Sequence, residues 1–371
     1  MSVTIRDRLN SYVQNGDIAG GSILVRKNGE IVSKEFAGFA DIEKQIPVSE
    51  NTVFRLASMS KPVAAAGILL LKQENRLSVS DLLTDYLPEF SDLSVGVLKE
   101  DGSVSLSPLA RPLTLEDLLR HRSGMGHGGV SVSYGVNTVA PGTTLKERAY
   151  QLSRAPLDFQ PGAETGYSAR CAFDVLGRVI EVVSGMELSA FLKEKFFDPL
   201  CMPDTAFVPN EDMKKRLVRL YDRSKGTLKD FYAPDVIDSP FLFSYPSGSA
   251  GLFGTLSDYD NFVQMLAGRG KRILSDETLA QMTVPDPTLM TPKGAWGLGI
   301  QVFNKKSVSS RSLAQGTFGW SGAFGTHFYI DPVNDVTVII MVNRLDIGGS
   351  GSYVSFGLEE AVFEEMHLIE E

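Results

Sequence analysis

The chain has 371 residues, of which 43% are hydrophobic and 22% are charged, and it carries a formal net charge of −9 with a pI near 5.2. This composition is typical of a globular protein with a sizeable core and excludes an intrinsically disordered chain. The negative charge argues against nucleic acid or an anionic membrane as partner, because both bind to clusters of Lys and Arg.

The N-terminal segment lacks the apolar stretch and the small-residue cleavage site of a signal peptide. The longest apolar run, residues 63–71, is much shorter than the about 20 residues that a membrane span needs. We therefore expect a cytoplasmic protein. Cys171 and Cys201 both have apolar neighbours, which predicts two buried free thiols; a single disulfide bridge is the alternative.

The first 57 residues read as a helix followed by a β-hairpin, because the β-rich runs 21–26 and 31–36 flank the turn signal Asn28-Gly29. Helical spacing then predominates. It predicts helices over residues 62–72, 114–119, 168–184 and 187–197, the second starting with a capping box at Thr114 and the third ending at Gly185.

Residues 200–250 show weak periodicity and are interpreted as surface loops, followed by helices that begin at Ser257 and Ser275. The last third of the chain returns to β-rich runs. These predict strands over residues 297–304, 312–318, 326–330 and 336–343, and a final acidic helix over 354–366.

Strands at both ends and helices between them predict an α/β plus all-α fold, with an antiparallel sheet flanked by helices and an inserted helical domain. The predicted α/β domain comprises residues 1–57 and 245–371, and the mainly helical domain comprises residues 58–244. The cleft between them is the expected active site.

Ser58 and Lys61 form a Ser-x-x-Lys pattern at the start of a predicted helix. Residues three apart share one helix face, so the hydroxyl and the ammonium are expected to meet. Pro62 fits only in the first turn of a helix, which places the start near Ser58. A capping serine with a surface lysine is the alternative interpretation of these four residues.

Two further segments fit the same chemistry. Tyr167 follows a glycine-containing loop and precedes a helix, and a neighbouring ammonium makes a phenol a better proton acceptor. Residues 318–325 (FGWSGAFG) combine small residues with a strand, so a backbone N–H there can approach a substrate carbonyl. Taken alone, Tyr167 is better explained as an aromatic ring packed under a loop, and a bulged strand needs the glycines of residues 318–325 just as much as an oxyanion hole does.

In this order, these segments resemble the serine β-lactamase and penicillin-binding-protein superfamily, and most closely the group of class C β-lactamases, DD-peptidases and family VIII carboxylesterases. The resemblance covers nearly the whole chain and implies a β-lactamase/transpeptidase-like fold. It rests on residues 54–61, 114–124, 160–168, 174–177, 199–205 and 248–252.

The resemblance implies that Ser58 is the nucleophile and that Lys61 and Tyr167 share the general-base and general-acid work, with the first base left open. It also implies an oxyanion hole formed by the backbone N–H groups of Ser58 and Ala323.

Two positions depart from the lactamase pattern. Trp320-Ser321-Gly322 stands where lactamases and DD-peptidases usually carry Lys-Thr-Gly, so the lysine that meets a substrate carboxylate is missing. Ala169 stands where many lactamases carry an Asn that contacts the substrate amide. Both departures favour neutral esters over lactams and peptides.

We also expect Ser321, Gly322, Trp320, His327 and Trp296 to line the substrate pocket, although core packing is an equal alternative for Trp296. His121 and His127 are interpreted as structural or rim residues. The chain contains no Gly-x-Ser-x-Gly, His-Glu-x-x-His or phosphate-binding loop, so an α/β-hydrolase, a metal and a nucleotide cofactor are not expected.

The sequence therefore predicts a serine carboxylesterase that acts on small neutral esters through an acyl-enzyme, with no cofactor. A β-lactamase, DD-peptidase or acyltransferase of the same fold is the alternative. A penicillin-binding-like protein without turnover is a third reading, which the presence of Ser58, Lys61 and Tyr167 together disfavours.

Overall fold

A computed structural model describes residues 3–230, 245–286, 288–289, 294–303, 313–349 and 351–368. Within these residues the main sheet has eight antiparallel strands, in the order β10-β11-β12-β13-β14-β1-β2-β3. Their bounds are β10 (Ala295–Trp296), β11 (Gln301–Val302), β12 (Phe318–Ser321), β13 (His327–Asp331), β14 (Val336–Val342), β1 (Gly20–Lys27), β2 (Glu30–Asp41) and β3 (Ile46–Pro47).

The two ends of the chain meet in the middle of this sheet, where β1 pairs with β14 in a register that joins Ile23 to Ile340. All seven residues of β14 are buried, because helices cover both faces of the sheet. Ile23 packs with the terminal helices α1 (Ile5–Gln14) and α14 (Tyr353–Met366), while Leu24 faces the opposite core.

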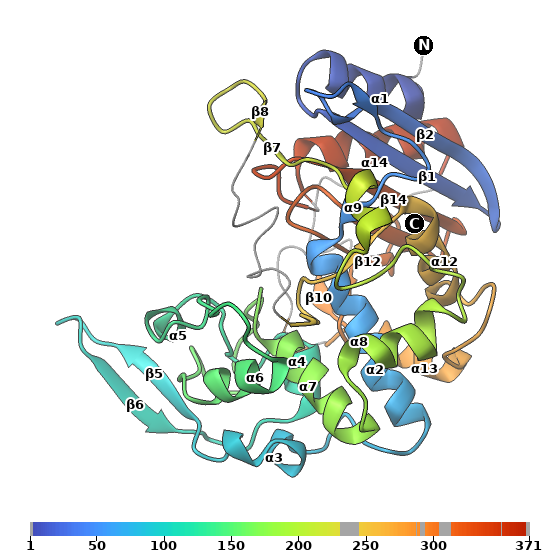
Figure 1. Ribbon diagram of the computed structural model, residues 1–371. Coiled ribbons are helices and arrows are strands. Elements are labelled where there is room, and N and C mark those ends of the chain that lie inside the picture. The colour runs from blue at the N-terminus through green and yellow to red at the C-terminus, as the bar shows by residue number, and fades with distance from the viewer. Residues whose placement is uncertain are drawn as a thin grey trace.

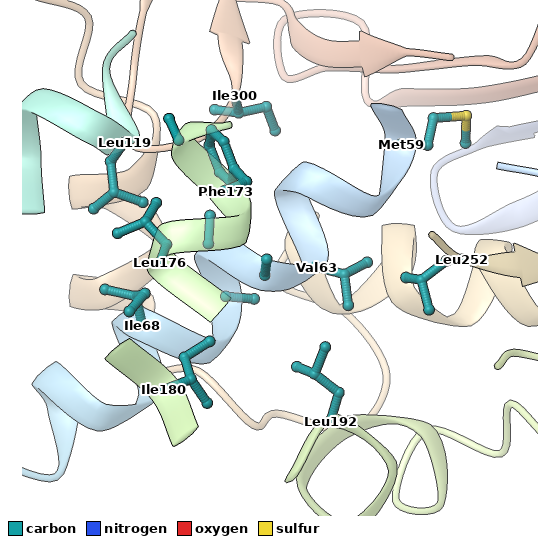
Figure 2. Close-up of a cluster of buried hydrophobic side chains, with 14 of the residues drawn as sticks. Met59, Val63, Ile68, Leu119, Phe173, Leu176, Ile180, Leu192, Leu252 and Ile300 are labelled. Atoms are coloured by element: carbon teal, nitrogen blue, oxygen red, sulfur yellow. The ribbon is translucent and has the colours of Figure 1, made fainter. Parts of the chain in front are cut away.

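The second core surrounds α2 (Ser60–Gln73), which is buried from Ser60 to Leu71. Helix α7 (Ala172–Ser184) packs against it, and Figure 2 shows Ile68 of α2 beside Leu176 and Ile180 of α7. As predicted, α7 ends at Gly185, whose φ of 74° lies in the left-handed region that glycine adopts without strain. This packing fixes α2 within the core.

The remaining elements lie around these two cores. In chain order they are β4 (Phe54–Arg55), η1 (Ala57–Met59), α3 (Leu83–Tyr86), η2 (Pro88–Phe90), β5 (Ser94–Leu98), β6 (Val104–Pro108), α4 (Leu115–Leu119), α5 (Val130–Ser133), α6 (Leu145–Ser153), α8 (Leu188–Leu192), the π-helical turn η3 (Lys193–Phe197), α9 (Glu211–Arg216), β7 (Tyr221–Asp222), β8 (Lys229–Asp230), β9 (Phe253–Gly254), α12 (Leu256–Leu266) and α13 (Asp276–Met282).

The predicted fold class, an antiparallel sheet flanked by helices, is confirmed. The reading of residues 200–250 as loops is wrong in part, because α9 and the β7–β8 pair lie there. The hairpin β5–β6, which projects from the body in Figure 1, was not predicted. The strand predicted over 312–318 starts only at Phe318, and residue 312 lies outside the described residues.

Both cysteines are free thiols, as predicted, but only Cys171 is buried, whereas Cys201 is exposed. Burial raises the pKa of the Cys171 thiol to about 11. No helix within the described residues is long and apolar enough to cross a membrane.

Asp258, in the first turn of α12, gives the fold a pH-dependent stability. Its carboxylate is 5% exposed and accepts hydrogen bonds from the Asp204 N–H at 2.7 Å and the Thr205 hydroxyl at 3.0 Å. Burial nevertheless raises the pKa of Asp258 from 3.8 to about 6. The folded protein therefore holds this proton more tightly than the unfolded chain, and stability falls as pH rises through that interval.

We expect Asp258→Asn to remove this loss. Between pH 4 and pH 7 the free energy of unfolding of the wild type should fall by about 2–3 kcal/mol relative to the variant. Urea unfolding at a series of pH values measures the difference. Asp276→Asn, at an exposed carboxylate in the first turn of α13, is the control and should run parallel to the wild type. Parallel curves for Asp258→Asn would contradict the assignment.

Candidate active site

Ser58 lies in η1, a 3-10 helix of one turn directly before α2, and is partly exposed. Two hydrogen bonds of the buried Ser60 hydroxyl hold this turn in place. The hydroxyl donates to the Ala57 carbonyl at 2.7 Å and accepts a hydrogen bond from the Leu252 N–H at 3.0 Å. Ala57 has a φ of 46°, a left-handed conformation that is uncommon for alanine. The chain therefore presents Ser58 at the surface from a tightly constrained bend.

The Lys61 ammonium is 1% exposed and sits among three acceptors. Its Nζ donates to the Ala169 carbonyl at 2.7 Å, the Ser249 carbonyl at 2.8 Å and the Ser58 hydroxyl at 3.2 Å. An ammonium has three N–H bonds, so these acceptors use all of them. As predicted, the structure brings Ser58 and Lys61 together.

Asp174, in the first turn of α7, holds one of these acceptors in place. Its buried carboxylate accepts the N–H of Ser249 at 3.0 Å and the hydroxyls of Ser247 and Tyr245, both at 2.7 Å. The Ser249 hydroxyl accepts the Asp174 N–H at 3.1 Å in return. Arg148 compensates the buried charge from 3.6 Å. Asp174 lies in a segment that carries the family resemblance, but its residue type and spacing alone do not indicate this role.

Tyr167 lies in the loop before α7, and the Lys61 Nζ is 4.9 Å from the centre of its ring. The structure thus places the other two residues of the predicted catalytic set, Ser58 and Tyr167, beside the Lys61 ammonium. The Tyr167 hydroxyl has no hydrogen bond to another described residue. The residue is partly exposed, so its oxygen is available to a bound substrate.

An aromatic cluster surrounds Tyr167. The Trp320 ring lies 5.1 Å from the Tyr167 ring, and the Trp296 ring stacks on Tyr167 at 6.0 Å with an interplanar angle of 6°. Trp320 is partly exposed on β12, whereas Trp296 is 5% exposed. The structure therefore places Trp320 where it can meet a substrate and Trp296 behind it as packing.

The end of β12 passes beside the nucleophile turn. A Cβ atom on Gly322 would lie 2.3 Å from the Leu56 carbonyl, so only glycine fits this crossing. The Thr326 hydroxyl donates to the same carbonyl at 3.1 Å. Ser321 is buried, and Ala323 is exposed in the turn that follows. This crossing brings the Ala323 turn close to Ser58, whose N–H, in the first turn of a helix, has no intrahelical acceptor.

The structure corrects one predicted pocket residue. His327 lies on β13, but its side chain points to the face of the sheet that α14 covers, where its Nε2 is 3.1 Å from the Glu359 carboxylate. Its Nδ1 is 3.2 Å from the Trp320 carbonyl. Successive residues of a strand face opposite sides, so His327 points away from the core that contains Ser58.

No group of three or more His, Cys, Asp or Glu side chains within the described residues could hold a metal ion. The chemistry that the site offers is that of a hydroxyl nucleophile, a fixed ammonium, a phenol and backbone N–H donors.

Comparisons with known proteins identify the family of the chain. The Beta-lactamase family model matches residues 5–355. Esterase EstB of Burkholderia gladioli is 30% identical over 93% of this chain and 91% of its own length, and a putative D-alanyl-D-alanine carboxypeptidase of Salmonella typhimurium is 27% identical over 91% and 82%.

Solved structures share the fold. EstCE1, described as a hydrolase with promiscuous acyltransferase activity, superposes with a TM-score of 0.84 at 24% identity over 97% of both chains. Simvastatin synthase (LovD) of Aspergillus terreus, in its unliganded selenomethionyl form, superposes with a TM-score of 0.82 at 19% identity, also over 97% of both chains. The chain belongs to the β-lactamase family and is a serine hydrolase.

Proposed function

We propose that this hydrolase is a carboxylesterase that cleaves small neutral carboxylic esters through an acyl-enzyme on Ser58. The observation that carries the proposal is the position of Trp320. It presents an aromatic ring 5.1 Å from Tyr167, at the strand position where the lactamases and DD-peptidases of the family present a lysine. An apolar ring favours an uncharged acyl or alcohol group there.

The proposed acylation uses the fixed ammonium as an electrostatic group. Because Lys61 already donates three hydrogen bonds, the base in the proposed route is the phenolate form of Tyr167, which takes the Ser58 proton. The Lys61 charge compensates the negative charge that moves from the Tyr167 oxygen to the Ser58 oxygen. The Ser58 Oγ bonds to the ester carbon, and the carbonyl oxygen becomes an oxyanion that accepts hydrogen bonds from the backbone N–H groups of Ser58 and Ala323.

The tetrahedral intermediate then collapses. The bond to the leaving alcohol breaks, and Tyr167 returns the proton to the alkoxide. A water molecule attacks the acyl-enzyme and gives a proton to Tyr167. The second collapse breaks the bond between the acyl carbon and the Ser58 Oγ, Tyr167 returns the proton to that oxygen, and the carboxylic acid is released. Each step uses the same oxyanion donors, so one site serves both halves of the reaction.

The same geometry disfavours substrates with a carboxylate and an amide. A hydrogen bond to a charged group contributes about 1.5–3 kcal/mol, or on the order of ten- to a hundredfold in binding. Trp320 carries no charge, and its one donor, the indole N–H, is buried. Ala169 offers no side-chain amide, and its carbonyl is occupied by Lys61. An ester without a carboxylate or an amide needs neither contact, so neither Trp320 nor Ala169 weakens its binding.

A substrate panel tests the proposal. We expect kcat/KM for p-nitrophenyl acetate or butyrate to exceed that for a chromogenic cephalosporin or a D-Ala-D-Ala peptide by about a hundredfold or more. A fluorophosphonate probe should add one label at Ser58, seen by intact mass. Trp320→Lys should narrow the ratio of ester to cephalosporin turnover, whereas Trp320→Phe, which keeps an aromatic ring, should preserve it.

Cephalosporin turnover equal to ester turnover in the wild type would instead identify a lactamase. Faster transfer of the acyl group to an added alcohol than to water would identify an acyltransferase, the activity named for EstCE1. No label at Ser58 would exclude all of these reactions.

A further inference from the structure

His121 binds the chain on both sides of Tyr167. Its carbonyl accepts the Gly166 N–H at 2.9 Å, and its Nδ1 accepts the Ser168 N–H at 3.1 Å. The imidazole ring also packs against the Tyr167 ring, with 4.8 Å between the ring centres. Three contacts from one residue therefore fix the position of the phenol.

The backbone at His121 is held in an uncommon conformation for this purpose. Its φ of 53° is left-handed, just after α4 ends, and the residue is completely buried. Left-handed residues other than glycine occur in few places, and they persist where the surrounding structure requires them. Here the conformation directs the carbonyl and the ring toward the same three-residue segment.

The hydrogen bond from Ser168 also determines the form of the imidazole. Because Nδ1 accepts a hydrogen bond, the proton of the neutral ring is on Nε2, which is buried without a partner among the described residues. The groups around the ring are Lys61 from α2, Phe173 from α7, Trp296 from β10, and Tyr167 itself. Burial, followed by the charges of Lys61 and His127, lowers the pKa of His121 well below its usual range.

We infer that His121 is a positioning residue of the active site, which holds Tyr167 in its working orientation toward Ser58 and Lys61. The inference rests on the proton-transfer role proposed for Tyr167. A neutral acceptor suits this task, because an imidazolium has no free Nδ1 lone pair and would face the Lys61 ammonium. Misplacing a reacting group by about 1 Å costs on the order of a hundredfold in rate.

A double-mutant cycle tests the inference. His121→Leu removes the acceptor, and we expect it to lower kcat for p-nitrophenyl butyrate by about ten- to a hundredfold per active site, with little change in KM. In the Tyr167→Phe background the same substitution should lower kcat less than about threefold, because the group that His121 positions no longer reacts. Active-site concentrations come from fluorophosphonate titration, which removes any effect of unfolded protein.

A conservative variant separates positioning from packing. His121→Asn keeps an acceptor and tolerates positive φ, so it should recover a large part of the activity that leucine loses. The pH profile of kcat/KM should shift for His121→Leu and remain close to the wild type for His121→Asn. His127→Asn, at an exposed histidine of the same loop, is the control and should stay within about twofold of the wild type.

Equal losses for His121→Leu in the wild-type and Tyr167→Phe backgrounds, with an unchanged pH profile, would overturn the inference. Wild-type rates for Tyr167→Phe itself would instead refute the role proposed for Tyr167. The two failures are therefore distinguishable in one set of measurements.

Discussion

Ser58→Ala should lower kcat/KM for p-nitrophenyl esters by about 10⁴-fold or more and leave the thermal midpoint close to that of the wild type. The loss is large because no acyl-enzyme can form, and the oxyanion donors alone supply a small residual rate. Stability is preserved because Ser58 is partly exposed and its hydroxyl accepts a single hydrogen bond, from Lys61.

Ser60→Ala is the matched control, two residues further along the chain. Its hydroxyl is 1% exposed and joins the Ala57 carbonyl to the Leu252 N–H, so its loss should cost about 1–2 kcal/mol of stability. Its kcat should remain within about tenfold of the wild type. The two variants thus have opposite expected profiles, measured by steady-state kinetics and thermal unfolding. Equal rates for Ser58→Ala and the wild type would disprove the acyl-enzyme route.

The second large effect is expected for Lys61→Met, which should lower kcat/KM by about a thousandfold. Methionine has a similar length, but it removes the charge and all three donated hydrogen bonds. Lys61→Arg should not rescue activity, because the planar guanidinium cannot direct three N–H bonds from one nitrogen at three surrounding acceptors. The rate of fluorophosphonate labelling at Ser58 should fall in parallel with turnover.

Lys72→Met is the control on the same helix. The Lys72 ammonium donates to the Gln281 side chain at the far end of α2, away from Ser58, so its loss should leave the kinetics unchanged. Circular dichroism and thermal unfolding show whether each variant is folded. More than a tenth of the wild-type kcat/KM in folded Lys61→Met would contradict the role of the ammonium.

Much of the fold could be predicted because its strongest signals are local. The Asn28-Gly29 turn, the Thr114 capping box and the Gly185 terminus are each encoded within a few residues, and each is found in the structure. The hairpin β5–β6 escaped prediction because residues 94–108 have mixed polarity. Its exposed Val97 and Leu106 do not alternate against a buried face as strand residues commonly do.

The parts of the site that are formed by side chains could be predicted from the sequence, whereas the parts formed by the backbone could not. Ser58, Lys61 and Tyr167 lie together as expected. The backbone carbonyls of Ala169 and Ser249 accept hydrogen bonds from the Lys61 ammonium. Because every residue type has a backbone carbonyl, the sequence does not indicate these two acceptors. His121 was read as structural or rim because one histidine in a loop does not reveal which N–H groups it meets.

The direction of His327 was mispredicted for a related reason. All five residues of β13 are buried, and the apolar residues Phe328, Tyr329 and Ile330 follow one another with no polar residue between them. Phe328 and Ile330 face one core, and Tyr329 faces the other with His327. Strand periodicity assigns a face only when one face is polar, and β13 offers no such contrast.

The pairing of β1 with β14 has a consequence for biosynthesis. Gly21 lies opposite Val342 in this pairing, so the ribosome must add 321 residues (342 minus 21) before β1 can pair with β14. At about 5–20 residues per second, this takes roughly 16 to 64 seconds. During that time the hydrophobic strand Gly20–Lys27 has only the β2 hairpin as a partner. The nascent chain therefore exposes one apolar strand edge for most of its synthesis.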